Sequence, residues 1–150
     1  STKKTAEEYE SLAISAIKYM VLKHNIGSDI IFDFEQALSI KGDAAPYLQY
    51  TYARLKSILT KSGKEIKNIE LSALQEEELK VIKKLLNFPD AVKDSAENHA
   101  PNSLALYLYE LTTQANHYYE KVRILSDEVK EPERNARLLL IGTIASVLKR

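Results

Sequence analysis

Tyrosine and arginine side chains recur at helical spacing in two separate stretches of this chain. In the first stretch, Tyr47, Tyr50 and Arg54 are three and four residues apart, so a helix places them on one stripe. Flat aromatic rings beside a guanidinium group are suited to stacking against nucleobases. The spacing therefore predicts a surface that binds nucleic acid through its bases.

A second stretch, further along the chain, carries a similar polar and aromatic stripe. It consists of Tyr109, Thr112, Asn116, Tyr119 and Arg123. Asn116 can hydrogen-bond a base edge, Tyr119 can stack, and Arg123 can pair with phosphate or stack. We predict that the two stripes form opposing walls of one site, with Tyr50 and Arg54 facing the second stripe.

Other tyrosines lie on the apolar stripes of the same two helices. Tyr52, Tyr107 and Tyr118 fall in register with leucines, so we expect all three in the core. For Tyr50 and Tyr119 two interpretations remain open. Each ring either contacts a bound base or lies in the core with its hydroxyl at the rim.

The segments around these stripes carry helical signals, and no segment alternates polar and apolar residues long enough to form a sheet. A capping box of Thr5 and Glu8 begins the first helix, and Gly27 closes that segment. Gly63 ends the tyrosine helix. Further helix starts are expected near Asp33 with Gln36, Pro46, Ser72 with Gln75, Pro89, Pro101 and Pro132. We predict an all-α helical bundle.

Length and composition fit one globular domain over residues 1–150, with 45% hydrophobic and 28% charged residues. The net charge is zero, which gives no overall support for nucleic-acid binding. The charge is nevertheless uneven: residues 41–67 carry six basic and two acidic side chains, whereas residues 70–98 carry four basic and seven acidic ones. The positive segment contains the first tyrosine stripe.

The sequence contains none of the usual catalytic or metal-binding motifs. It has no cysteine, and His24, His99 and His117 lack the spacing of a helical metal site. Its four glycines form no phosphate-binding loop. The acidic residues 76–78 lie in a first helical turn, where we expect a solvated charged face. We predict no catalytic residue and no metal ligand in this segment.

The chain also has no apolar run long enough to cross a bilayer and no basic and apolar leader. Together with the lack of cysteine, these features favour a cytoplasmic protein. The first residue is Ser1 rather than methionine, from which we expect a piece excised from a longer protein.

Several ordered motifs resemble the anticodon-binding domain of arginyl-tRNA synthetases, the so-called DALR domain. Residues 30–39, a glycine loop and the motif PYLQY at 46–50, followed by Ala53 and Arg54, are similar to the start of that domain. Further motifs recur in the same order, namely residues 16–19, residues 106–111, Asn116 with Tyr119, and residues 136–138. The last of these, around Arg137, corresponds to the element that gives the domain its name. The resemblance covers nearly the whole chain.

This resemblance implies a helical bundle that grips the anticodon stem and loop of arginine tRNA, while a separate catalytic domain activates arginine with ATP and Mg²⁺. In that family an aromatic residue at the position of Tyr119 stacks on a splayed anticodon-loop base, and Arg123 could stack where relatives have an aromatic residue. The implied anticodon-binding residues are Tyr47, Gln49, Tyr50, Arg54, Asn116, Tyr119 and Arg123. The implied partners are arginine tRNA and the protein's own catalytic domain, with no DNA and no membrane, in a monomer.

The chain departs from the family pattern in three places. Its loop reads Gly42-Asp43-Ala44-Ala45-Pro46, without the second glycine and the threonine that the family often has. It stops at Arg150, before the glycine- and leucine-rich stretch with which relatives usually continue. It also lacks the two ATP-binding signatures of class I synthetases, so we expect this segment alone to be catalytically silent, with no cofactor of its own.

Two alternative functions remain, one from a different class of protein and one from a related synthetase. The zero net charge and the apolar, tyrosine-bearing helices would also suit a helical protein-interaction module that binds no RNA. The anticodon domain of a glycine-type synthetase is the nearest related possibility, and the PYLQY motif favours arginine over it.

Overall fold

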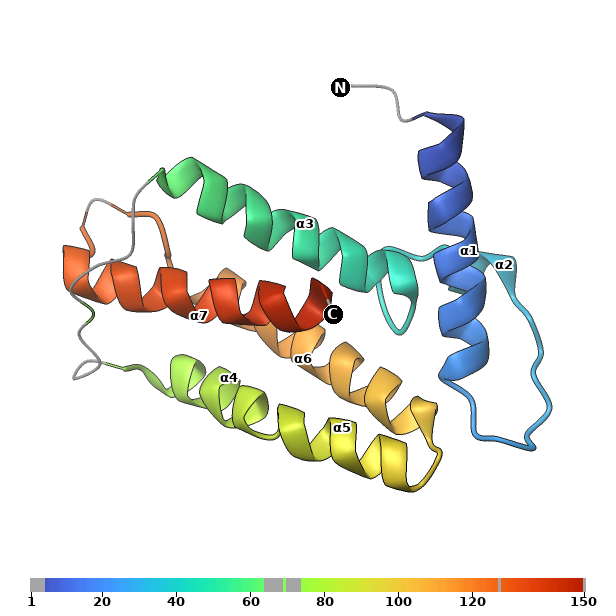
Figure 1. Ribbon diagram of the computed structural model, residues 1–150. Coiled ribbons are helices and arrows are strands. Elements are labelled where there is room, and N and C mark those ends of the chain that lie inside the picture. Colours follow the sequence, from blue (N-terminus) through green and yellow to red (C-terminus); the bar gives the residue numbers. More distant parts are fainter. Residues whose placement is uncertain (1–4, 64–68, 70–73, 127, 150) are drawn as a thin grey trace.

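The computed structural model describes residues 5–63, 69, 74–126 and 128–149, and over these residues every regular element is a helix (Figure 1). This confirms the predicted all-α fold. The helices are α1 (Ala6–Leu22), α2 (Phe34–Ala37), α3 (Ala45–Ser62), α4 (Glu76–Leu86), α5 (Phe88–Glu97), α6 (Pro101–Lys121) and α7 (Glu131–Lys149). Across the described ranges no helix is both long and apolar enough to span a membrane.

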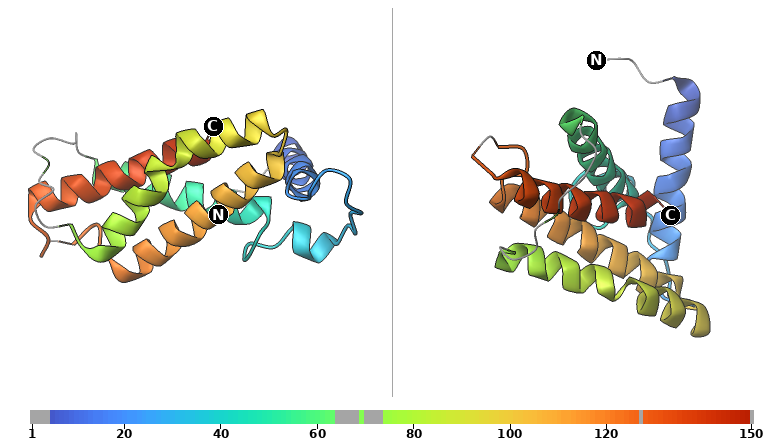
Figure 2. Two further views of the ribbon diagram at one scale, coloured as in Figure 1. Left: turned by 90° about the horizontal axis from the view of Figure 1, so that it is seen from below. Right: turned by 60° about the vertical axis from the view of Figure 1, so that its left-hand side comes forward.

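Helix α6 is the centre of the bundle, because it contacts α1, α3, α4, α5 and α7. The right-hand view of Figure 2 shows α7, α6 and the α4–α5 pair one below another, with α1 standing across their ends. Apolar side chains from α3, α4, α6 and α7 meet between these layers. The fully buried members of this core include Leu55, Val81, Leu111, Leu138 and Ile141.

Most predicted helix starts and stops are confirmed. The Thr5 side chain and Glu8 form the expected capping box, with the Glu8 carboxylate 2.7 Å from the backbone nitrogen of Thr5. Gly63 ends α3 with a φ of 58°, a left-handed conformation that glycine adopts without steric cost. Helix α1 is shorter than predicted, since it ends at Leu22, and Gly27 (φ 83°) lies in the turn that follows.

Helix α4 begins at a different cap from the one predicted. Gln75 is the N-cap residue, and the Glu78 carboxylate accepts a hydrogen bond from its backbone N–H at 2.6 Å. Ser72, which we expected to cap this helix, lies outside the described residues. Asp33 caps α2 as predicted, because its carboxylate accepts the backbone N–H groups of Glu35 and Gln36.

Helix α1 is fixed to the rest of the bundle by polar contacts with the loop before α3. The Tyr19 hydroxyl lies 2.7 Å from an Asp43 carboxylate oxygen and 3.2 Å from the backbone carbonyl oxygen of Ala105. Lys23 donates to the backbone carbonyl of Asp43 at 2.8 Å. The loop that departs from the family pattern therefore still holds α1 against α3 and α6.

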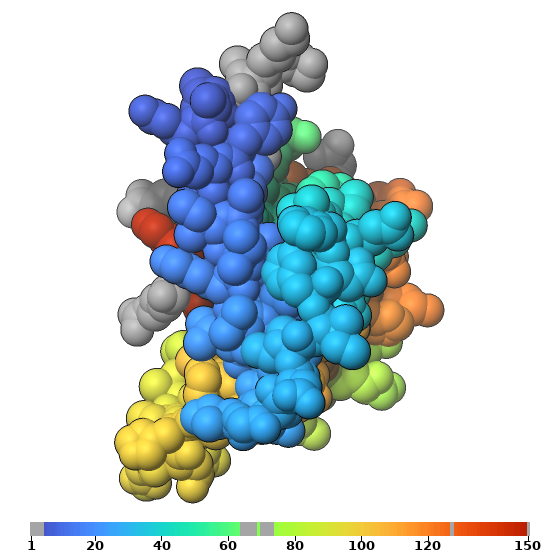
Figure 3. All heavy atoms as spheres, turned by 90° about the vertical axis from the view of Figure 1, so that its right-hand side faces the viewer, coloured from blue at the N-terminus to red at the C-terminus, as the bar shows by residue number. Residues whose placement is uncertain are grey.

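The other face of α1 and the loop through α2 leave many apolar side chains exposed. They are Ile14, Ile17, Val21, Leu22, Ile26, Ile31, Phe34, Leu38 and Ile40. Figure 3 looks directly onto this side of the molecule, where α1 and the loop lie next to each other. An apolar surface of this kind is typical of a contact with another protein surface.

Candidate nucleic-acid interface

The two predicted stripes pack against each other, because α3 and α6 are in contact. Near the start of α3, the rings of Tyr47 and Tyr109 lie 6.0 Å apart between centroids, at an interplanar angle of 56°. About two turns further along, Arg54 reaches Asn116 and Tyr119. The stripes were predicted to be opposing walls of one site. The structure shows them in direct contact, so they form one continuous surface.

Arg54 lies at the centre of this surface. Its Nη1 donates to the Asn116 side-chain oxygen at 3.1 Å, and its Nη2 donates to the Tyr50 hydroxyl at 3.1 Å. The central carbon of its guanidinium, Cζ, lies 4.8 Å from the centre of the Tyr50 ring and 5.2 Å from that of the Tyr119 ring. Both distances are within the range of cation–π attraction. We call Tyr50, Arg54, Asn116 and Tyr119 the Tyr–Arg cluster.

The two tyrosines of the Tyr–Arg cluster are exposed at the surface. Tyr50 is 48% exposed and Tyr119 is 41% exposed. Tyr107 and Tyr118 are buried as predicted, and Tyr52 is partly buried against the core. The cluster tyrosines are therefore surface rings that a flat ligand can reach, while the core tyrosines are covered by neighbouring side chains.

Asn116 is held on both sides of its amide. Its oxygen accepts from Arg54, and its nitrogen donates to the Thr51 hydroxyl at 2.8 Å. The Thr51 hydroxyl in turn donates to the backbone carbonyl of Tyr47 at 3.0 Å, and Thr51 is fully buried. This arrangement orients Asn116 toward Arg54, whereas the sequence suggested that Asn116 reads a base edge.

Two of the predicted site residues lie away from the Tyr–Arg cluster. Gln49 makes no contact with Arg54, Asn116 or Tyr119 among those described, and it lines grooves between α1 and α3, one of which Tyr50 also borders. Arg123 follows the end of α6, and its side chain is 83% exposed, with a carboxylate oxygen of Glu128 at 4.0 Å. Tyr47 lies next to the cluster. Its backbone carbonyl accepts a hydrogen bond from the Thr51 hydroxyl, and its ring contacts the Tyr109 ring.

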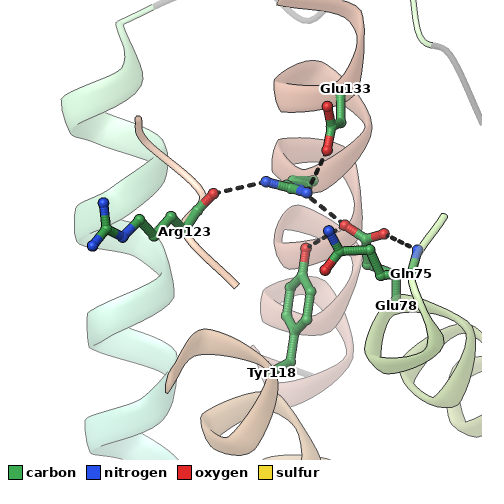
Figure 4. A network of polar contacts seen from close by, with 6 residues as sticks. Gln75, Glu78, Tyr118, Arg123 and Glu133 are labelled. Carbon is green, nitrogen blue, oxygen red and sulfur yellow. Dashed lines mark hydrogen bonds and ion pairs between the residues drawn. The ribbon is translucent and has the colours of Figure 1, made fainter. Parts of the chain in front are cut away.

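A buried ionic network under the end of α6 was missed by the sequence reasoning (Figure 4). The side chain of Arg137 is 4% exposed, and its Nε donates to the Glu78 carboxylate at 2.9 Å. A second nitrogen of Arg137, Nη2, donates to Glu133, and the Tyr118 hydroxyl lies 3.4 Å from the Glu78 carboxylate. The expectation that residues 76–78 form a solvated face is therefore wrong for Glu78, which is 2% exposed.

This network also fixes the chain that leaves α6. The Nη1 of Arg137 donates to the backbone carbonyl of Arg123 at 2.9 Å, and Figure 4 shows the Arg123 side chain turned away from this contact. Because Tyr119 lies one turn before that point, the network supports the end of the helix that presents the ring. The motif around Arg137 stands out in the sequence, but its buried partner Glu78 does not.

Tyr118 gives the network a dependence on pH. Burial and the nearby Glu78 carboxylate raise the pKa of the Tyr118 phenol above its usual range. The pKa of Tyr19 and that of Tyr107 are also raised, mainly by burial. A raised phenol pKa stabilises the folded state fully below pH ~10, the pKa of an unfolded tyrosine, and that stability is lost as the pH rises above it.

We therefore expect the free energy of unfolding to fall steeply above pH ~10 and Tyr118→Phe to flatten this fall. One phenol that stays protonated in the folded state contributes about 1.4 kcal/mol per pH unit. Urea unfolding at a series of alkaline pH values measures the slope. Equal slopes for the two proteins would show that Tyr118 ionises as easily in the folded state as in the unfolded one.

Comparison with known protein families assigns most of this chain to one family. The family described as the DALR anticodon binding domain matches residues 48–150, the part of the chain that contains most of α3 and all of α4 to α7. These residues include the whole Tyr–Arg cluster and the Arg137 network.

Arginine–tRNA ligases are similar to the chain over nearly its full length. The enzyme of Fusobacterium nucleatum is 39% identical over 93% of the chain, and that of Lactococcus lactis is 35% identical over 95%. The solved structure of Thermus thermophilus arginyl-tRNA synthetase superimposes with a TM-score of 0.90 at 32% identity, over 98% of the chain and 26% of that structure. The chain spans 25% of the length of the two ligases. It therefore belongs to the DALR anticodon-binding domain family and corresponds to the quarter of arginine–tRNA ligases that forms this domain.

Proposed function

We propose that this domain binds the anticodon stem and loop of arginine tRNA through the Tyr–Arg cluster. The observation that carries the proposal is the pair of exposed rings, Tyr50 and Tyr119, both within cation–π distance of the Arg54 guanidinium. Unstacked bases of an RNA loop bind to aromatic and guanidinium surfaces of this kind. Tyr47 supports the cluster, whereas Gln49 and Arg123 would contact RNA only at its edges.

The chemical reaction belongs to the remainder of the parent ligase. We propose that residues 1–150 form one domain of a longer arginine–tRNA ligase, whose catalytic domain binds ATP and Mg²⁺ and joins arginine to its tRNA. The chain spans 25% of the matching ligases, which supports the proposal.

We place the parent protein in the cytoplasm as a monomer. The exposed apolar face of α1 and the α2 loop is the surface on which we expect its catalytic domain to pack.

Binding of arginine tRNA tests the proposed function. We expect the domain to bind arginine tRNA more tightly than the same tRNA carrying another anticodon loop, and to bind both more weakly as salt is raised. The affinities are measured for both RNAs at two salt concentrations. Equal affinity for an unrelated tRNA would contradict anticodon recognition. The lack of any RNA binding, together with a protein partner that shields Tyr50 and Tyr119, would support a protein-interaction module instead.

A further inference from the structure

Arg54 has no acidic partner among the residues that the structure describes. None of the ion pairs between those residues involves it. Its contacts are a neutral amide, a phenol hydroxyl and two aromatic rings. By contrast, Arg137, the buried arginine of the same bundle, is paired with two carboxylates. The charge of Arg54 is therefore available to an anion from outside the protein.

The hydrogen bonds of Arg54 leave donors for that anion. Nη1 and Nη2 each donate one bond within the described part of the protein. A guanidinium carries further N–H groups in a fixed plane, and these match the oxygens of a phosphate group. The protein thus orients the Arg54 guanidinium but leaves some of its N–H donors without a hydrogen bond to the described residues.

The orientation comes from residues that are themselves engaged inside the protein. The Asn116 side-chain oxygen accepts a hydrogen bond from Arg54, and its side-chain nitrogen donates one to the hydroxyl of the buried Thr51. Because both ends of its amide are already engaged, Asn116 is better placed to fix the guanidinium than to bind a base. The Thr51–Asn116 pair joins α3 to α6 at this point, so the guanidinium has a defined position relative to both helices.

Arg54 also leaves only part of each neighbouring ring open. Its guanidinium lies over both the Tyr50 ring and the Tyr119 ring and covers part of each. A base that stacks on either ring must use the ring surface that the guanidinium leaves open. A phosphate that links two such bases would pass close to the guanidinium between them.

We propose that Arg54 binds a backbone phosphate of the RNA loop, and that Asn116 and Thr51 are positioning residues that hold it there. This inference rests on the proposed function, because it assigns roles within the same surface. Arg54 then contributes to affinity and to its salt dependence, while base stacking is left to Tyr50 and Tyr119.

Salt dependence separates this role from simple packing. The dissociation constant for the anticodon stem–loop of an arginine tRNA is measured at several potassium chloride concentrations for the unmodified domain, Arg54→Gln and Arg54→Lys. We expect Arg54→Gln to weaken binding at low salt by about tenfold or more. It should also reduce the slope of log Kd against log salt by about 0.7, the value for one phosphate contact on single-stranded RNA. Arg54→Lys should keep most of the slope, because the charge remains.

Asn116→Asp tests whether the unpaired charge of Arg54 is what the RNA uses, because it leaves Arg54 in place. The new carboxylate keeps an acceptor beside the guanidinium but neutralises its charge, so we expect the same loss of slope as in Arg54→Gln. Lys56→Gln is the matched control, since Lys56 lies on α3 in the groove facing α7 and loses the same charge away from the cluster. Its slope should match that of the unmodified domain. Helical circular dichroism confirms that each variant is folded.

The outcomes distinguish this inference from the proposed function. If Arg54→Gln weakens binding but leaves the slope unchanged, Arg54 only supports the two rings, and the phosphate role is overturned while RNA binding stands. If Lys56→Gln lowers the slope as much as Arg54→Gln does, the effect is one of overall charge, and the assignment is also overturned. If the unmodified domain does not bind the stem–loop, the proposed function fails and this inference fails with it.

Discussion

Replacing Arg137 with methionine is expected to lower the free energy of unfolding by about 3–5 kcal/mol, the usual cost of removing one partner of a buried ion pair. The loss leaves Glu78, which is 2% exposed, as a buried carboxylate without its cation. It also removes the hydrogen bond to the backbone carbonyl of Arg123. The network joins α4, α6 and α7, so its loss affects the whole bundle.

Urea unfolding at neutral pH measures the effect of Arg137→Met. The control is Lys80→Met, which removes the exposed ion pairs with Glu76 and Glu77. Exposed pairs contribute little, so this variant should lose far less stability than Arg137→Met. Adding Glu78→Leu to Arg137→Met should recover part of the lost stability, because this carboxylate is then no longer buried without its cation. Similar losses for Arg137→Met and Lys80→Met would contradict the role given to the network.

Tyr119→Ala is expected to weaken binding of the anticodon stem–loop by about 1–3 kcal/mol, the range for losing one stacked base. The ring is 41% exposed, so its removal should disturb the core little. The substitution also removes the cation–π contact between Arg54 and Tyr119, which adds to the loss of affinity. Titration of the labelled stem–loop gives the dissociation constant.

Tyr119→Phe is the matched control, since it keeps the ring and removes only the hydroxyl. It should bind as well as the unmodified domain, because stacking needs only the ring face. A melting temperature recorded for each variant separates binding from folding. If Tyr119→Ala lowers the melting temperature but leaves the affinity of the folded protein unchanged, Tyr119 is a structural residue and not a base contact.

The helices and the two stripes could be predicted because they depend on local signals. Caps, prolines and the period of 3.6 residues act within a few positions of the sequence, so Thr5, Pro101 and Gly63 mark helix ends. The contact between Arg54 and Asn116 joins residues 62 positions apart, and no local pattern encodes such a pair. The sequence therefore identified the surface residues but not that Asn116 would be used to hold Arg54.

Three further differences have physical causes in the helices themselves and in their packing. Arg123 leaves the stripe because α6 ends at Lys121 and Val122 is extended, so helical spacing no longer applies. Gln49 precedes Tyr50 by one residue, so the helix rotates its side chain by about 100° from that of Tyr50, and Gln49 lines a groove with α1 residues that Tyr50 does not reach. Glu78 stands in a row of three glutamates, and only the packing of α4 against α6 and α7 decides which of them is buried.

Binding of the anticodon loop on the surface formed by α3 and α6 is tested most directly by photo-crosslinking. The probe is an arginine tRNA with 4-thiouridine placed in its anticodon loop, and the modified peptides are identified by mass spectrometry. We predict crosslinks on the Tyr–Arg cluster, at Tyr50 or Tyr119. Crosslinks confined to the α4–α5 side of the bundle, with none on α3 or α6, would contradict this prediction.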